Sequence, residues 1–339
     1  MHIKRRGEMD GESLIELEKL AKSYRDTSLS EASRRAYRAD WTVFESFCDL
    51  YGARALPATS QTICAYISNC AEQGKNIHTI VRSLTSINKA HELAGFPPVR
   101  DPLVRATLRG IRRSLGSIPD KAPAISYFEV LRMADSCEPS VLGVRDKAIL
   151  LTGWCSALRR SELVALNIGD LEFSEKGVIV TIRRSKTDQE GEGSRIAIPF
   201  AAGPLCAVKA LDRWIGRLYP QDKKPESPLF LSIGSGGRRR WYKKNHTGRL
   251  TPRMISIIVK KYAKITGLPS NRYSAHSLRR GLATEAGAAQ IPERVIARHT
   301  RHRSFDVLRG YIEDGNIWDE NPLGVIYATG PVPIPSSRE

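Results

Sequence analysis

A small set of cationic and proton-donating side chains, followed by one tyrosine, is the part of the chain best suited to chemistry. The set consists of Arg159, Lys186, His276, Arg279, His302 and Tyr311. The tyrosine follows His302 by nine residues, and His276 precedes Arg279 by three. Side chains of these types can surround one phosphate while a phenol attacks it. The set therefore predicts phosphoryl transfer through a covalent link between the tyrosine and the phosphate.

Each residue type suits one task in such a reaction. Arginine binds phosphate through a planar, permanently charged fork, so Arg159 and Arg279 are candidate phosphate clamps. Glu162 follows Arg159 by three residues, which lets its carboxylate orient the guanidinium. A tyrosine, with an ordinary pKa of about 10, needs neighbouring cations or a base to act as a nucleophile. Lys186, in a predicted turn, is a candidate acid for the leaving oxygen.

Each assignment also has a plainer alternative. A tyrosine near the end of an amphipathic helix is commonly a core or rim residue, and a lysine in a turn is commonly only exposed to solvent. His299 lies one turn before His302 and competes with it for the same role. The two histidines could share a metal at a helix end, but no third ligand stands at a suitable spacing, so no metal is expected. The occurrence of all these groups in one order favours the chemical interpretation.

The overall charge points to a polyanionic partner. The chain has 339 residues, with 53 Lys and Arg against 36 Asp and Glu, and a formal net charge of +17. This length suits two domains, and the positive excess favours a polyanionic partner. No run of about 18 apolar residues is present and no signal peptide is evident, so we expect no membrane partner. The six cysteines form no CxxC pair, which favours a reducing cytoplasm, here in association with the nucleoid.

The first part of the chain has the apolar spacing of amphipathic helices, which stops at a Gly-, Ser- and Pro-containing segment at residues 114–123. Four helices are predicted there, marked by apolar residues over 37–51, 63–70, 77–91 and 104–115. The last one carries Arg105, Arg109, Arg112 and Arg113. Such a group commonly forms a solvated face, but at this net charge we expect it to lie against a DNA backbone.

The second part mixes helices with strands. Helices are predicted over 127–137, 144–154, 203–218 and 252–266, and another carries Arg159 and Glu162. β-rich runs at 178–182 and 195–199 flank a polar turn and predict a hairpin with Lys186 near its tip. A basic loop over 236–244 is either a disordered insertion or a phosphate-contacting loop. Its candidate contacts are Arg238, Arg239, Arg240, Lys243 and Lys244.

Taken together, these segments resemble the tyrosine site-specific recombinases, or phage-type integrases, including their two-domain Cre-like members. The resemblance is carried by residues 157–163, 184–188, 276–281 and 302–312, within roughly residues 28–326. It implies a mainly α fold with a small β-sheet or hairpin, of the α+β class. It also implies five segments, namely an N-terminal extension (1–27), a helical, SAM-like core-binding domain (28–115), a linker (116–126), a catalytic domain (127–314) and a C-terminal tail (315–339).

The resemblance further implies how the residues act. Tyr311 is the implied nucleophile, Glu162 is accessory, and Arg160 is only a neighbour of the catalytic Arg159. The remaining members of the implied catalytic set are Lys186, His276, Arg279 and His302. The implied reaction cuts double-stranded DNA at inverted-repeat sites through a 3′-phosphotyrosine and rejoins it by way of a four-way junction. A homotetramer carries out the implied reaction without ATP, metal or another cofactor. The resemblance also implies a link to mobile elements.

Two other functions remain open at this point. One is a type IB topoisomerase-like enzyme that relaxes supercoils, and the other is a catalytically silent DNA-binding regulator of the same fold. The tail bears on this choice, because an apolar cluster around Leu323 and Ile326 is expected to dock on an adjacent protomer. A monomeric topoisomerase would not need such an element.

Overall fold

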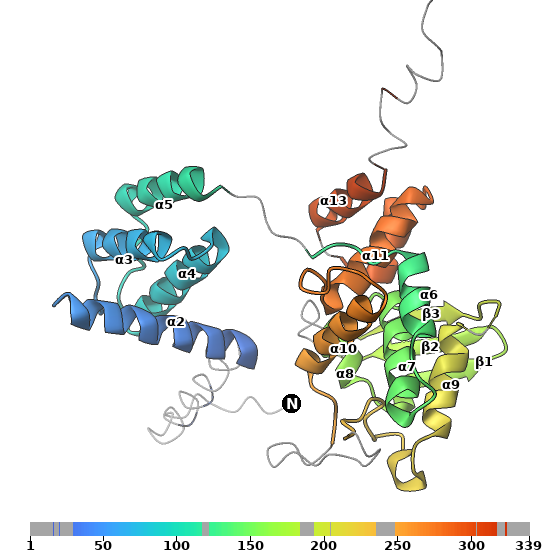
Figure 1. The fold of residues 1–339 in the computed structure, drawn as a ribbon. Helices are drawn as coiled ribbons and strands as arrows, with labels where there is room; N and C mark the ends of the chain where they lie inside the picture. The colour runs from blue at the N-terminus through green and yellow to red at the C-terminus, as the bar shows by residue number, and fades with distance from the viewer. Residues whose placement is uncertain are drawn as a thin grey trace, which may run out of the picture. The chain divides into compact units, whose positions relative to one another are not determined.

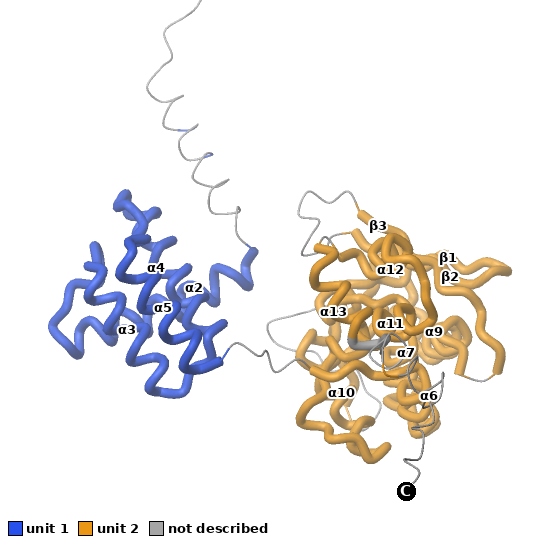
Figure 2. The backbone as a smooth tube through the Cα atoms, turned by 90° about the horizontal axis from the view of Figure 1, so that it is seen from above, with its two compact units in different colours: residues 1–120 blue, residues 121–339 orange. Residues whose placement is uncertain are grey.

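A computed structural model describes residues 30–116, 122–183, 193–203, 205–234, 248–302 and 304–316, together with residues 16, 20 and 323. The chain forms two compact units, Met1–Asp120 and Lys121–Glu339 (Figure 2). Within these described ranges, no helix has both the length and the apolar character needed to cross a membrane.

Residues 30–116 of unit 1 form four helices and the connections between them, as the apolar spacing predicts (Figure 1). Its helices are α2 (Glu31–Leu50), α3 (Ser60–Glu72), α4 (Ile77–Leu93) and α5 (Pro102–Leu115). Each helix is preceded by a capping residue whose side-chain oxygen accepts a hydrogen bond from a backbone N–H of the first turn. This hydrogen bond stabilises the start of the helix. These capping residues are Ser30, Thr59, Asn76 and Asp101. The four predicted helices are confirmed.

The core of unit 1 consists of the apolar faces of these helices. Ile63, Tyr66, Ile67 and Cys70, which mark the second predicted helix, are all buried. The ring of Phe44 meets that of Tyr66 edge-on, with centroids 5.0 Å apart. Amphipathic helices that bury one stripe in this way leave the opposite stripe to solvent. In α5 the buried residues are Val104 and Ile111, so its arginines lie on the exposed side.

Unit 2 combines helices with one small sheet. Its helices are α6 (Tyr127–Asp135), α7 (Val141–Cys155), α8 (Arg160–Ala165), α9 (Ala207–Gly216), α10 (Pro252–Ile265), α11 (Ala275–Ala288), α12 (Glu293–Thr300) and α13 (Phe305–Asn316), with short 3₁₀ helices at Ile168–Asp170 and Pro220–Asp222. The strands are β1 (Leu171–Ser174), β2 (Gly177–Ile182) and β3 (Ser194–Pro199). The predicted class, mainly α with a small β-sheet, is confirmed.

The sheet is antiparallel, in the order β1-β2-β3. Val178 stands opposite Ile198 and Ile182 opposite Ser194, which confirms the predicted hairpin. The sequence does not predict β1, because this strand is only four residues long and three of them are exposed. A strand this short has too little alternation to be distinguished from a turn.

The segment around Ile125, at the start of unit 2, packs against helix α11. The backbone N–H of Ile125 donates to the carbonyl of Ser277 at 3.1 Å, and Trp154 Nε1 donates to the carbonyl of Ile125 at 2.9 Å. Gly281 makes this approach possible, since a Cβ there would collide with the carbonyl oxygen of Ile125. Helix α11 also packs against α13, where a Cβ on Gly287 would lie only 2.9 Å from the Cα of Ile312. Close contacts at two of its glycines therefore hold α11 in place.

Candidate active site

Tyr311 lies on α13 in a small apolar cluster between α11, α12 and α13. Its neighbours in this cluster are Ala283, Ile296, Ala297 and Leu308, and its own exposed fraction is 7%. The side chain is thus a core residue, as the plainer alternative holds. Its hydroxyl nevertheless has a reactive neighbour, because Tyr311 Oη lies 3.0 Å from His276 Nε2. The core role and the chemical role are compatible in this residue.

Three further groups surround the tyrosine ring. The His302 ring centroid lies 5.8 Å from that of Tyr311, and the His276 ring centroid lies 6.2 Å away. The guanidinium carbon of Arg280 lies 5.4 Å from the centre of the tyrosine ring. A cation over an aromatic face is attracted to it electrostatically. The phenol is therefore held among two imidazoles and one guanidinium.

Arg159 and Glu162 make the contact that their spacing predicts. Arg159 Nη1 donates to Glu162 Oε1 at 2.7 Å, and the backbone N–H of Arg159 donates to Oε2 at 2.9 Å. Arg159 is the residue immediately before α8, whereas the sequence places it within the helix. The neighbouring Arg160 is exposed. Of these two consecutive arginines, Arg159 is the one that the carboxylate orients.

Glu162 also accepts a hydrogen bond from a second arginine. Arg301 Nη2 donates to Glu162 Oε2 at 2.8 Å, although the two residues are far apart in the sequence. Burial raises the pKa of Glu162, but the charge of Arg301 and the hydrogen bonds from Arg159 outweigh this effect. The pKa of Glu162 therefore lies below its ordinary value, and the carboxylate is ionised at neutral pH.

Arg279 is the most deeply buried cation of the cluster, with an exposed fraction of 1%. Its Nη1 donates to the carbonyl of Ala157 at 2.7 Å, while its Nη2 is buried with no hydrogen-bond partner among the described residues. Burial, and then the charges of Arg159 and Arg301, lower the pKa of Arg279 to about 9, so it remains protonated at neutral pH. A buried donor without a partner is costly, and an anionic ligand would satisfy it.

The two histidines that compete for one role have different surroundings. His302 Nδ1 lies 2.6 Å from Thr300 Oγ1, and its ring is beside Tyr311. His299 Nε2 lies 2.7 Å from the carbonyl oxygen of Cys155, a backbone contact that holds the end of α12 against the end of α7. The geometry favours His302 as the histidine of the candidate site. His299 has a structural contact instead.

The described part of this cluster does not include several of the predicted residues. Lys186, in the β2–β3 connection, lies outside the described residues, as do Arg238, Arg239, Arg240, Lys243, Lys244 and most of the tail. Arg105, Arg109, Arg112 and Arg113 lie in unit 1, where all four are exposed on α5. Arg109 follows Arg105 by four residues, and Arg112 and Arg113 follow Arg109 by three and four, which places all four along one side of that helix.

The structure adds two cations that the sequence reasoning missed, Arg280 and Arg301. Arg280 is next to Arg279 in the sequence, and Arg301 is next to His302. Neither arginine has a spacing to another candidate residue that would mark it as part of the site. Arg301 depends on a contact with a residue of α8, and no local spacing pattern can reveal such a contact. Arg280 Nη1 donates to the carbonyl of Ala122 at 2.8 Å, which links it to the start of unit 2.

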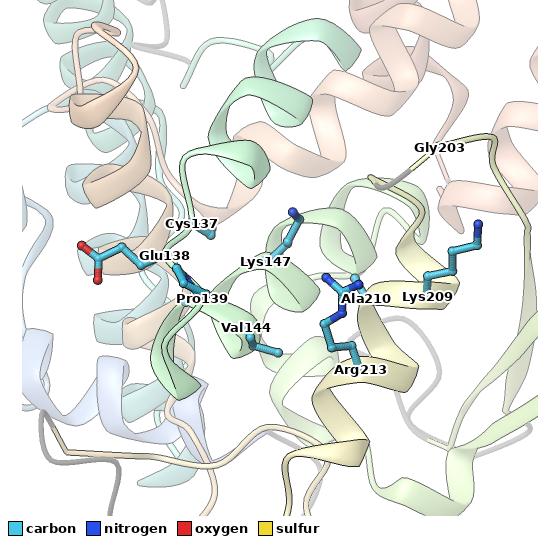
Figure 3. A pocket seen from close by; sticks show the side chains of 10 residues that line it. Cys137, Glu138, Pro139, Val144, Lys147, Gly203, Lys209, Ala210 and Arg213 are labelled. Atoms are coloured by element: carbon cyan, nitrogen blue, oxygen red, sulfur yellow. The ribbon is translucent and has the colours of Figure 1, made fainter.

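A hollow of about 410 Å³ lies elsewhere in unit 2, between the α6–α7 connection and α9 (Figure 3). Lys147, Lys209 and Arg213 are part of its lining, and Figure 3 shows the carboxylate of Glu138 turned away from them. Among the described residues, its lining includes no member of the candidate catalytic set. The hollow is therefore separate from the candidate active site.

Comparison with known proteins identifies the class. Residues 124–316 match the phage integrase family. The integrase/recombinase xerD homolog of Selenomonas ruminantium is 37% identical over 313 residues, which cover 91% of this chain and 89% of that protein. A tyrosine recombinase XerC of Thermodesulfovibrio yellowstonii is 27% identical over 287 residues, covering 83% of this chain and 85% of that protein.

Solved structures agree on the fold. A lambda integrase tetramer bound to a Holliday junction matches with a TM-score of 0.58 at 16% identity, covering 91% of this chain and 79% of that chain. The Tn1549 transposon integrase in complex with transposon right end DNA matches with a TM-score of 0.57 at 16% identity, covering 86% and 92%.

The chain therefore belongs to the phage integrase family. It is an enzyme of the tyrosine recombinase and integrase class, which cleaves and rejoins DNA strands.

The surroundings of His302 predict a pH-dependent stability. Burial, followed by the charges of Arg279, Arg159, His276 and Arg301, lowers the pKa of His302 to about 3. An unfolded histidine has a pKa of about 6.5, so below that pH the unfolded state binds a proton that the folded state does not. The stability that the neutral His302 ring contributes to the folded state is fully present above pH 6.5. It is lost progressively as the pH falls from 6.5 towards 3. We expect the free energy of unfolding to fall less steeply across this window in His302→Gln than in the wild type.

Chemical denaturation at a series of pH values measures this difference. His78→Gln, which replaces an exposed histidine of α4, is the control and should follow the wild-type curve. Parallel curves for His302→Gln and the wild type would contradict the account of this site.

Proposed function

We propose that this protein is a site-specific DNA recombinase in which Tyr311 attacks the scissile phosphate. The observation that carries the proposal is the convergence of Tyr311 and His276 with the guanidiniums of Arg159 and Arg279. These groups come from the residue before α8 and from α11 and α13, so only the folded chain assembles them. The attack forms a bond between Tyr311 Oη and phosphorus and breaks the bond to the 5′-oxygen. The products are a 3′-phosphotyrosine and a free 5′-hydroxyl.

The hydroxyl proton of Tyr311 needs an acceptor in this step. His276 Nε2, which lies 3.0 Å from Tyr311 Oη, is placed to accept it. Partial burial and the charges of Arg279, Arg280 and Arg159 lower the pKa of His276, which favours a neutral ring that can accept a proton. Arg159 and Arg279 would bind the phosphate oxygens and stabilise the charge of the transition state. The reverse attack by the 5′-hydroxyl of a partner strand would rejoin the DNA, which conserves the bond energy without ATP or metal.

DNA binding is assigned to both units in this proposal. The exposed arginines of α5 are suited to a phosphate backbone, since they form one basic side of a helix in a chain of net charge +17. The residues of the 236–244 loop would add phosphate contacts from unit 2. Unit 1 would then be the core-binding domain and unit 2 the catalytic domain. Recombination through a four-way junction would bring together a homotetramer on inverted-repeat sites.

The nucleophile can be tested with a nicked suicide duplex, from which the cleaved fragment is lost so that the covalent intermediate accumulates. Tyr311→Phe keeps the ring that packs between α11, α12 and α13 but lacks the attacking oxygen. We expect it to bind DNA with wild-type affinity and to form no protein–DNA adduct. Tyr219→Phe, at a tyrosine with an exposed fraction of 59%, is the matched control and should form the adduct normally.

The outcomes of this experiment separate the candidate functions. An adduct formed by Tyr311→Phe would exclude Tyr311 as the nucleophile. A wild-type protein that binds DNA without any adduct would be a silent regulator. A wild-type protein that forms the adduct and relaxes plasmids, but never joins two sites, would be a topoisomerase.

Lys186 is proposed as the acid that protonates the leaving 5′-oxygen from the β2–β3 hairpin. Replacing that oxygen with sulfur gives a leaving group that needs little protonation. Lys186→Ala should therefore cleave the sulfur-containing substrate far faster than ordinary DNA. Lys176→Ala, which removes an exposed lysine from the turn between β1 and β2, should cleave ordinary DNA at the wild-type rate. Equal defects of Lys186→Ala on both substrates would refute this role.

A further inference from the structure

Arg301 has a backbone conformation that an arginine rarely adopts. It follows the last residue of α12 with φ 57° and ψ 47°, in the left-handed region. A side chain with a Cβ is disfavoured in this conformation, which glycine or asparagine adopts more readily at helix ends. The α12 terminus alone therefore does not account for an arginine here. The side chain must supply something that compensates for the backbone cost.

The Arg301 side chain reaches the centre of the candidate site. Its exposed fraction is 10%, and its Nη2 donates to Glu162 Oε2 at 2.8 Å. The other carboxylate oxygen, Oε1, accepts from Arg159 Nη1 at 2.7 Å. Two guanidiniums from different parts of the chain therefore share one buried carboxylate. The Nε of Arg301 is buried without a hydrogen-bond partner among the described residues.

This sharing exceeds what Glu162 needs for its own burial. Arg159 alone already gives the carboxylate an ion pair and a backbone hydrogen bond. Asp40 in unit 1, which is also largely buried, is paired with a single arginine, Arg82, through two side-chain hydrogen bonds of 2.7 and 2.9 Å. The second arginine on Glu162 instead adds a charge. Arg159, Arg279 and Arg301 together bring three guanidiniums to one carboxylate, a surplus of two positive charges before Arg280 is counted.

We propose that Arg301 is a positioning residue for DNA cleavage. It donates to Glu162 Oε2 while the Arg159 guanidinium donates to Oε1, so that the carboxylate orients Arg159 without fully neutralising it. The surplus charge matches the negative charge that develops on a phosphate under attack. This inference rests on the proposed function, since it assigns Arg301 a task in the same reaction. Without Arg301, the pair of Arg159 and Glu162 would be neutral, and Arg159 would stabilise the charge that develops in the transition state more weakly.

Single-turnover cleavage of the nicked suicide duplex by wild type, Arg301→Gly and Arg301→Asn tests this role. Both replacements suit the left-handed backbone, so thermal stability and DNA affinity should remain near the wild-type values. The cleavage rate should fall by about tenfold to a hundredfold, as small losses of alignment at a reacting centre do. Arg309→Gln is the matched control, because it removes an ion pair with Glu293 at the surface, and it should cleave at the wild-type rate.

A double-mutant cycle separates positioning from a general structural role. If Arg301 acts through Glu162, the variant with both Glu162→Gln and Arg301→Gly should cleave no more slowly than Glu162→Gln alone. In addition, removing the positive charge of Arg301 should raise the pKa of His302, measured by the NMR titration of its ring.

Wild-type cleavage by Arg301→Gly, or additive effects in the double variant, would overturn the inference. If even the wild type forms no adduct, the proposed function fails. The NMR titration then still tests the inference, because an unchanged His302 pKa in Arg301→Gly would refute the electrostatic link.

Discussion

The ion pairs of the buried Glu162 carboxylate are the interactions on which the site depends. Arg159, Arg279 and Arg301 would repel one another strongly in a partly buried cluster, where two like charges 4 Å apart interact by about 4 kcal/mol. Glu162 offsets part of this repulsion by accepting from Arg159 and Arg301. A buried ion pair of this kind is seldom a large source of net stability. Its presence here is better explained by the need to hold cations in place for an anion.

Arg279 illustrates the same constraint. It is almost fully buried, yet only its Nη1 has a described partner, the carbonyl of Ala157. That carbonyl is presented by a residue with φ 47°, a further strained position beside the site. Strain and unsatisfied donors commonly gather where a fold is arranged for a ligand and not for stability alone. The α7–α8 connection and α11 thus share the task of keeping a guanidinium ready for a phosphate.

Packing provides the second requirement, which is a fixed tyrosine. Glycines on α11 allow the segment around Ile125 and helix α13 to approach this helix closely, and Tyr311 is held between α11, α12 and α13. Close packing of the tyrosine ring limits the motion of the phenol oxygen relative to His276. Such alignment contributes to catalysis because the reacting groups need not be ordered at each turnover.

Much of this fold could be predicted from the sequence, since helices with a clear apolar period and the β2–β3 hairpin are encoded locally. The contact of Arg159 with Glu162 was also predictable from a spacing of three residues. The short strand β1 and the role of Arg301 were not, because the first lacks a pattern and the second joins residues that are far apart in the chain. The catalytic roles of the set, including that of Lys186, stay predictions.

A structure of the protein with orthovanadate bound in a nicked target duplex would test the central claim most directly, because vanadate adopts the geometry of a phosphate under attack. The account predicts Tyr311 Oη bonded to vanadium in an apical position. It also predicts the guanidiniums of Arg159 and Arg279 at hydrogen-bonding distance, about 2.7 to 3.2 Å, from the vanadate oxygens. Vanadate bonded to a different tyrosine, or beyond the reach of both guanidiniums, would contradict it.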